Sequence, residues 1–161
     1  LPLADYKGQT PLMLMAEAGD LELVRSMLAA GADPNQQDYV GRVALHSATA
    51  SGALAVAREL LEHGADPAKQ TFCGQSVLHT AVRAGSPELV ELLLDRAPSL
   101  TQQRNDEDMT PLDLAEELRA YPEARDELTK HMARQGRRSA TEQALDVMIK
   151  TLEQAAPTAK A

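Results

Sequence analysis

The chain of 161 residues contains no tryptophan, one phenylalanine, three tyrosines and one cysteine. Its core must therefore be built from aliphatic side chains, and the 43% of apolar residues is enough for one continuous core at this length. A single cysteine excludes an internal disulfide, which indicates a reducing compartment or a protein indifferent to the redox state of its surroundings. We expect a cytoplasmic protein, or a nuclear one if the source is eukaryotic. No apolar run approaches the roughly 18 residues of a membrane-spanning helix.

Basic residues are also too few for some functions. The formal net charge is −8, whereas proteins that bind nucleic acids or anionic membrane surfaces present basic faces. The nine glycines are spread along the chain and form no phosphate-binding loop pattern. The composition thus disfavours nucleic-acid and membrane partners.

What the chain does contain is an internal repeat. Tyr6, Tyr39 and Phe72 follow one another at intervals of 33 residues, and each opens a similar short phrase. The phrase Gly-Ala-Asp-Pro recurs at the same interval, at residues 31–34 and 64–67. A period of about 20 to 50 residues indicates a solenoid, because single units of this size cannot bury their apolar faces without a neighbour.

Each unit carries the signals of two short helices joined by a turn. Thr10 and Thr110 precede apolar residues, where a hydroxyl caps free backbone N–H groups. Pro11 and Pro111 follow at the first helical position, where a missing N–H costs nothing. Gly19 and its equivalents in the next two units suit a left-handed residue that closes the first helix. The second helix of each unit has one apolar stripe at i, i+3, i+6 and i+7.

These phrases resemble ankyrin repeats, with a Gly-x-Thr-Pro-Leu-His-x-Ala opening, then Gly-x-x-Glu-Leu-Val, then Leu-Leu-x-x-Gly-Ala-Asp. The resemblance covers roughly residues 5–130. It implies an all-α solenoid of antiparallel helix pairs stacked side by side, with hairpin loops that project as fingers. We expect a repeat domain over residues 1–136 and a C-terminal amphipathic helix with a frayed tail over 137–161. The expected repeats are 5–37, 38–70, 71–104 and a degenerate fourth at 105–136.

The two ends of the array differ in sequence. The expected second helix of repeat four, Pro122–Met132, has Arg125 and Thr129 where an interior helix would be apolar, which is typical of a terminal cap. Repeat one shows little polar adaptation, so a further repeat upstream is one hypothesis. The capping-box pattern at 139–142 predicts the C-terminal helix. That helix is expected to cover the last repeat, with partner docking or self-association as alternatives.

No set of residues predicts catalysis. The resemblance implies that His46 and His79 form hydrogen bonds between adjacent repeats, and neither has a carboxylate or cysteine at metal-ligand spacing. Cys73 has no base nearby in the sequence that would activate a thiol nucleophile. We therefore expect no enzyme activity, no metal and no cofactor.

The candidate binding residues lie on the fingers and the first helices. Tyr6, Tyr39 and Phe72 either anchor a partner, as aromatic residues do at interface hot spots, or pack between neighbouring fingers. The resemblance implies further contact positions on a concave face: Lys7, Gln9, Glu17, Val40, Arg42, Gln75 and Arg83.

The fourth finger is acidic, with Asp106, Glu107 and Asp108 in succession. These carboxylates are expected to attract a basic segment of a partner, an attraction that salt would weaken. The solubility of a terminal repeat is the alternative explanation. A third is that the Arg134, Arg137 and Arg138 cluster folds back on these acids.

The sequence therefore predicts a monomeric, non-enzymatic module that binds a partner protein through the concave face of fingers and first helices. Two alternatives remain open at this point. The chain is a regulatory or substrate-targeting part of a larger enzyme, or it is a structural spacer that self-associates through its C-terminal helix. The fold alone does not name the partner, because one scaffold serves many functions.

Overall fold

The structure is a computed structural model that describes residues 7–121 and 142–159. This part of the chain contains eight α-helices, one 3-10 helix and no strand, which confirms the all-α prediction. The helices are α1 (Pro11–Ala18), α2 (Leu21–Ala29), α3 (Ala44–Ser51), α4 (Leu54–Glu62), α5 (Val77–Ala84), α6 (Pro87–Arg96), η1 (Pro98–Gln102), α7 (Pro111–Ala120) and α9 (Glu142–Ala159).

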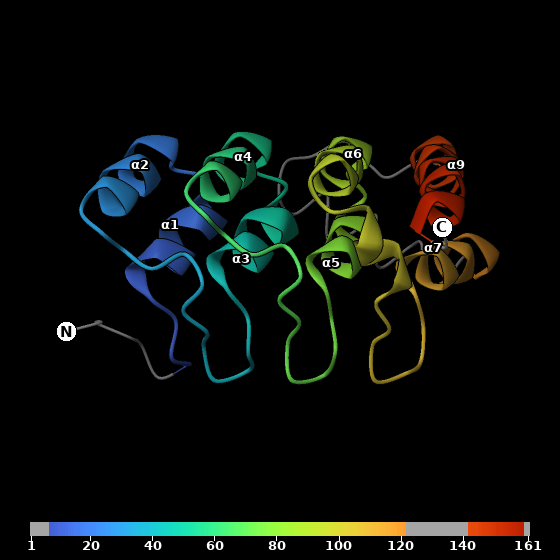
Figure 1. The fold of residues 1–161 in the computed structure, drawn as a ribbon, viewed down its shortest axis with the longest axis horizontal. Helices are drawn as coiled ribbons and strands as arrows, with labels where there is room; N and C mark the ends of the chain where they lie inside the picture. Colours follow the sequence, from blue (N-terminus) through green and yellow to red (C-terminus); the bar gives the residue numbers. More distant parts are fainter. Residues whose placement is uncertain (1–6, 122–141, 160–161) are drawn as a thin grey trace.

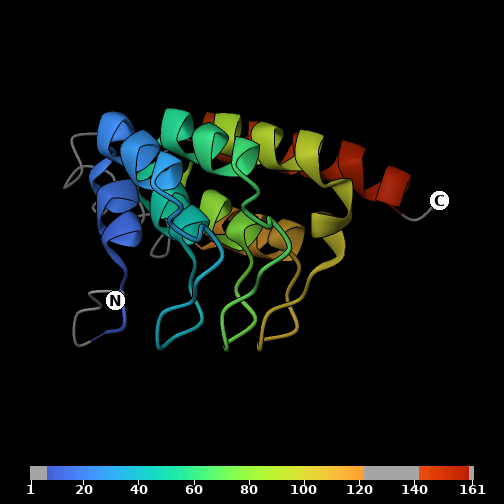
Figure 2. The same ribbon diagram turned by 60° about the vertical axis from the view of Figure 1, so that its left-hand side comes forward.

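The helices form two rows with the fingers on one side (Figure 1). The inner row is α1, α3, α5 and α7, and a finger leads into each of its later members. The outer row is α2, α4, α6 and α9, and Figure 2 shows the same two layers from the side. Neighbours pack within each row and across each pair. The rows thus place the fingers and the inner helices on one continuous face.

The core between the rows is aliphatic. Leu45 and Leu78 in the inner row and Leu60 and Leu93 in the outer row are fully buried, at 0% exposure. Each buried leucine of this kind contributes about 1.5–3 kcal/mol relative to an exposed one. Among the described residues no aromatic ring belongs to this core, as the composition predicted.

Helix ends follow the predicted signals. Gly19, Gly52 and Gly85 close α1, α3 and α5 in the left-handed conformation, with φ of 74°, 72° and 66°. Their backbone N–H groups donate to carbonyls of the last helical turn, which satisfies acceptors that a helix end otherwise leaves free. These three glycines therefore let the chain reverse into the outer helix of each pair.

The C-terminal helix α9 lies in the outer row, next to α6 and over α7 (Figure 1). Leu145, Met148 and Leu152 are at most 1% exposed, and α9 contacts α6, α7 and η1. Its apolar face is thus buried within the chain, as expected of a helix that covers the last repeat. The expected second helix of repeat four, Pro122–Met132, lies outside the described residues. The outer-row helix paired with α7 in the described chain is α9.

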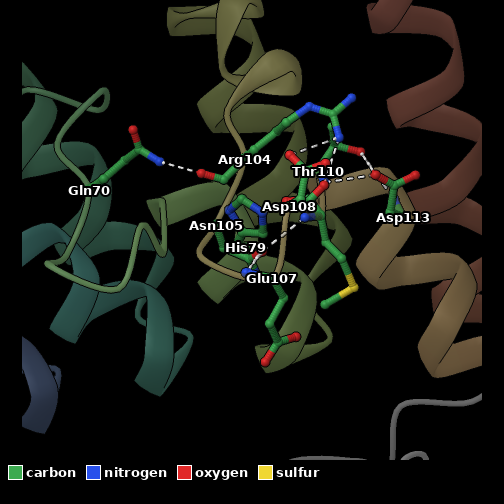
Figure 3. Close-up of polar contacts among 9 residues, drawn as sticks. Gln70, His79, Arg104, Asn105, Glu107, Asp108, Thr110 and Asp113 are labelled. Carbon is green, nitrogen blue, oxygen red and sulfur yellow. Dashed lines mark hydrogen bonds and ion pairs between the residues drawn. The ribbon is translucent and has the colours of Figure 1, made fainter.

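The N-terminus of α7 carries a complete capping box. The Thr110 hydroxyl oxygen accepts a hydrogen bond from the Asp113 backbone N–H at 3.2 Å. The Asp113 carboxylate in turn accepts from the Thr110 backbone N–H and hydroxyl, both at 2.8 Å (Figure 3). This reciprocal capping box satisfies two N–H groups at the first turn of the helix.

Substitution Thr110→Ala removes this cap and is expected to lower the free energy of unfolding by about 1 kcal/mol. Urea unfolding followed by circular dichroism measures the loss. Thr151→Ala on α9 is the matched control, because the Thr151 hydroxyl only donates to a carbonyl of its own helix, Val147, and caps nothing. Equal midpoints for the two variants would contradict the capping role.

Candidate functional site

The fingers are joined edge to edge by backbone hydrogen bonds. The Tyr39 N–H donates to the Lys7 carbonyl at 3.1 Å, and the Phe72 N–H donates to the Val40 carbonyl at 3.0 Å. The Asp106 N–H donates to the Cys73 carbonyl in the same way, at 3.0 Å. One such bond therefore connects each finger to the next, and the finger row is a continuous, pre-ordered surface.

A polar side chain braces each finger from within. The Asp38 carboxylate accepts from the Val40 and Arg42 N–H groups and from the Arg42 guanidinium, all at 2.9 Å. Burial acts to raise the pKa of Asp38, but these hydrogen bonds outweigh it and hold the pKa below its usual value. Thr71 and Asn105 brace the next two fingers through their own side-chain oxygens. These three bracing residues stand directly before Tyr39, Phe72 and Asp106 in the sequence. Their bracing role was not predicted, although a hydrogen-bonding residue at this position of each repeat is a signal that the sequence contains.

The aromatic rings pack on the preceding finger. A Cβ atom placed on Gly8 would lie 2.6 Å from Cδ1 of Tyr39, and one on Gly41 would lie 2.9 Å from Cδ1 of Phe72. Each ring therefore covers a glycine of its neighbour, which is the packing that the sequence offered as one alternative. Both residues are nevertheless 72% exposed. Tyr6 lies outside the described residues.

A groove of about 380 Å³ lies between the fingers and the inner helices. It brings together predicted residues from three repeats: Glu17, Val40, Arg42, Gln75 and Arg83. The sequence predicted no binding role for five further lining residues, which are His46, Ser47, Thr71, Cys73 and Thr80. Ser47 and Thr80 are detectable in retrospect, because they are polar where repeats one and four have leucine.

Four predicted residues on the described parts of the first three fingers are not among the residues that line this groove. Lys7 is exposed on the first finger, and the rings of Tyr39 and Phe72 lie over the neighbouring fingers. Gln9 is only 7% exposed, contrary to the expected contact role. It directly precedes the buried N-cap residue Thr10, where the chain enters the core, and this burial withdraws its side chain from any partner.

Two basic residues, Arg42 and Arg83, line the groove. Arg42 is held against Asp38, so its guanidinium is fixed and its charge is partly compensated. Arg83 is exposed on α5, and it forms no ion pair with the other residues that the structure describes. Glu17 adds one acid on the side of repeat one. The groove can therefore attract an acidic group through Arg83 above all.

The fourth finger presents its acids at an exposed turn. Asn105 accepts hydrogen bonds from the N–H groups of Glu107 and Met109, both at 3.0 Å, and Asp108 turns the chain with φ of 60° (Figure 3). The Arg104 guanidinium lies 3.5 Å from the Asp108 carboxylate and partly neutralises it. Asp106 and Glu107 are exposed. The cluster Arg134, Arg137 and Arg138 lies outside the described residues.

The two repeat histidines tie inner helices to the following fingers, as the resemblance implied. His46 Nδ1 accepts from the Val43 N–H, so the proton is on Nε2, which donates to the Gln75 carbonyl at 3.2 Å. His79 accepts from Ser76 and donates to the Met109 carbonyl at 2.8 Å (Figure 3).

Burial shifts the pKa of both repeat histidines downward. For His46, burial lowers the pKa to about 4. The hydrogen bond to Gln75 acts to raise this pKa, and the nearby charge of Arg42 acts to lower it further. Burial also lowers the pKa of His79, and Arg83 acts in the same direction. Both imidazoles are therefore neutral structural ties at neutral pH.

The described residues include no group of three or more His, Cys, Asp or Glu side chains that would suit a metal ion. Within the same residues, no helix is long and apolar enough to cross a membrane. Cys73 is a free, exposed cysteine on the third finger.

Stacked helix pairs, fingers joined edge to edge and a groove along the inner helices together define a helical-repeat solenoid. Two family models match the chain, one described as ankyrin repeats (3 copies) over residues 2–71 and one as ankyrin repeats (many copies) over residues 60–115. The chain belongs to the ankyrin-repeat family. Ankyrin repeats are in general protein–protein interaction modules and are typically non-enzymatic. No curated protein matched the chain in a sequence comparison.

Proposed function

We propose that this chain is a non-enzymatic module that binds a segment of a partner protein in the groove between fingers and inner helices. The observation that carries the proposal is the groove itself, in which side chains from three successive repeats converge on Arg42 and Arg83. The fingers joined edge to edge and the fixed Arg42 guanidinium support it, because a preformed surface loses little conformational freedom on binding.

The charges favour a particular kind of partner segment. An acidic side chain suits the centre of the groove at Arg83, and a basic segment suits Asp106 and Glu107 on the fourth finger. Such complementary charges raise the association rate and select the register of binding more than they raise affinity. The exposed parts of Tyr39 and Phe72 provide apolar contact beside the groove.

Charge reversal at Arg83 is the most direct test of this site. Repeats one and four carry Glu17 and Glu117 at the equivalent position, so Arg83→Glu places a residue there that the scaffold already accepts. The matched control is Arg58→Glu on the outer helix α4, which is exposed and lies outside the groove. Affinity capture from the native lysate, with quantitative mass spectrometry, identifies partners that the wild type retains.

We expect Arg83→Glu to reduce the recovery of such a partner at least tenfold, while Arg58→Glu recovers it like the wild type. The double variant Tyr39→Ala/Phe72→Ala tests the rings separately. If the groove variant and the control recover the same proteins equally well, the groove is not the binding site. Circular dichroism and melting temperatures verify that each variant is folded.

We further propose that the module is a cytoplasmic monomer. The exposed, unpaired Cys73 suits a reducing compartment, and the apolar face of α9 is already covered within the chain. Analytical ultracentrifugation tests whether the chain is a monomer. A dimer mass that disappears when a charge is introduced on the buried face of residues 142–159 would contradict the proposal.

A further inference from the structure

The first helix pair exposes large apolar side chains on its free side. Leu14 on α1 is 38% exposed and Leu23 on α2 is 44% exposed. Figure 1 shows α1 and α2 at one end of the two rows, with no described helix beyond them. These exposed side chains therefore belong to the helix pair at one end of the described array.

The positions equivalent to Leu23 are buried in the following repeats, whereas the positions equivalent to Leu14, which are Ser47 and Thr80, line the groove. Leu23 corresponds to Val56 in α4 and Leu89 in α6, which are 1% and 0% exposed. Leu14 corresponds to Ser47 in α3, which is 7% exposed. Repeats two and three differ from repeat one in having a preceding helix pair against which they pack. The face with Leu14 and Leu23 thus has the composition and shape of an inter-repeat interface that lacks its preceding member.

The opposite end of the array is built differently. Ala16, Thr49 and Val82 occupy one equivalent position in the first three repeats and are all 0% exposed. Repeat four has the exposed charge of Glu116 there. Arg119 and Asp146 add a solvent-exposed ion pair at 3.2 Å between α7 and α9. That end thus places exposed charges at positions that are buried in the preceding repeats, as a terminal repeat requires for solubility.

We propose that a further helix pair of the same repeat type docks on α1 and α2, and that the polypeptide immediately preceding the first repeat in the natural protein supplies it. Such a pair extends the interface that α1 and α2 already make with α3 and α4. It covers Leu14 and Leu23. In the same way, repeat one packs against the repeat that contains Ser47 and Val56, and repeat two packs against the repeat that contains Leu89.

A second copy of the chain suits this face less well. A two-fold dimer would place the α1/α2 face against itself, whereas each interface inside the array joins two different faces. A head-to-tail copy would bring Leu14 and Leu23 against the charged end with Glu116, Arg119 and Asp146. Burying those charges against apolar side chains is costly, even for the Arg119–Asp146 ion pair. The preceding repeat is the occupant whose chemistry matches.

The test compares Leu23→Lys in two proteins: the 161-residue chain, and the natural protein with everything that its gene encodes ahead of the first repeat. The readout is amide hydrogen exchange in α1 and α2, with the urea midpoint as a second measurement. Val147→Lys on α9 is the matched control, because Val147 is 46% exposed at the other end of the array.

We expect α1 and α2 amides to exchange at least tenfold more slowly in the natural protein than in the 161-residue chain. Leu23→Lys should remove that protection in the natural protein, yet leave the urea midpoint of the 161-residue chain unchanged. Val147→Lys should have no effect on α1 and α2 in either protein. This expectation is independent of partner binding in the groove.

Three results would overturn the proposal. The gene encodes no helical unit directly ahead of the first repeat, or α1 and α2 exchange equally fast in both proteins. In the third, the α1 and α2 amides of the 161-residue chain exchange more slowly as the protein concentration rises, and the chain has a doubled mass that Leu23→Lys abolishes. That result would assign the face to a second copy.

Discussion

Replacing Gly74 with alanine is expected to lower the free energy of unfolding by about 3 kcal/mol. Gly74 has a φ of 73°, where an alanine is strained by about 1–2 kcal/mol. Its added Cβ would also lie 2.9 Å from the Asn105 Cα and 3.1 Å from the Asp106 backbone nitrogen. Because those atoms belong to the backbone of the fourth finger, they cannot move aside as a flexible side chain would.

The chain offers a matched control for the strain alone. Gly31 has a φ of 92°, and a Cβ there meets nothing within 4 Å. Gly31→Ala should therefore cost only the backbone term, about 1–2 kcal/mol. Urea unfolding of both variants separates the two contributions, and the difference between them measures the contact between the third and fourth fingers. If the two variants were equally stable, the close approach of these fingers would not exist in solution.

Acidification is expected to destabilise the protein from about pH 6.5 downward, which is a higher pH than that at which carboxylates begin to titrate. The folded His46 imidazole has a pKa of about 4, whereas an unfolded histidine titrates near 6.5. Between these values the unfolded chain binds more protons than the folded chain, so the stability is fully present above about pH 6.5 and decreases as the pH falls. His46 alone accounts for a loss on the order of 3 kcal/mol between pH 7 and pH 4.

Two other groups act in the same direction. The lowered pKa of His79 adds to the loss over the same range. Asp38 also has a lowered pKa, so its contribution is present above its unfolded pKa of 3.8 and disappears only as the pH falls through its lower folded value. The histidine effect therefore precedes the effect of Asp38 during acidification.

Unfolding free energies measured from pH 7 to pH 4 check this expectation. His46→Gln should be less stable at pH 7, because it loses the paired hydrogen bonds to Val43 and Gln75, but its pH dependence should be shallower by on the order of 3 kcal/mol. His63→Gln serves as a control, since His63 is exposed at the end of α4. A wild-type slope in His46→Gln would show that His46 is not the group responsible.

Much of the architecture was predictable because it depends on local rules. The hydroxyl of Thr110, the proline after it and the glycines that end the inner helices act within one or two turns, and each performs its predicted role. The interval of 33 residues predicted the stacking, because repeated apolar stripes have no other way to be buried. The histidine ties followed from the family resemblance, which carries information on inter-repeat contacts.

Contacts between distant residues were harder to predict. Gln9 and Gln75 occupy equivalent positions, yet Gln9 is buried before α1 while Gln75 lines the groove. The sequence left more than one possible cover for the apolar face of α9, since amphipathic spacing indicates a helix with one apolar face but not the surface that covers this face. The groove residues Cys73 and Thr80 became visible only when the finger and the helix were brought together.

The sequence by itself determined the repeat, the helix pairs, the caps and an aliphatic core, because periodicity and local hydrogen bonding specify these features. The tertiary structure decided which side chains share a surface. It placed the rings of Tyr39 and Phe72 over the glycines of neighbouring fingers, and it set Arg83 beside Arg42 in one groove. It also left Leu23 exposed where Val56 and Leu89 are buried. Equivalent residues differ in this way because their burial depends on the neighbouring repeat, which the local sequence does not encode.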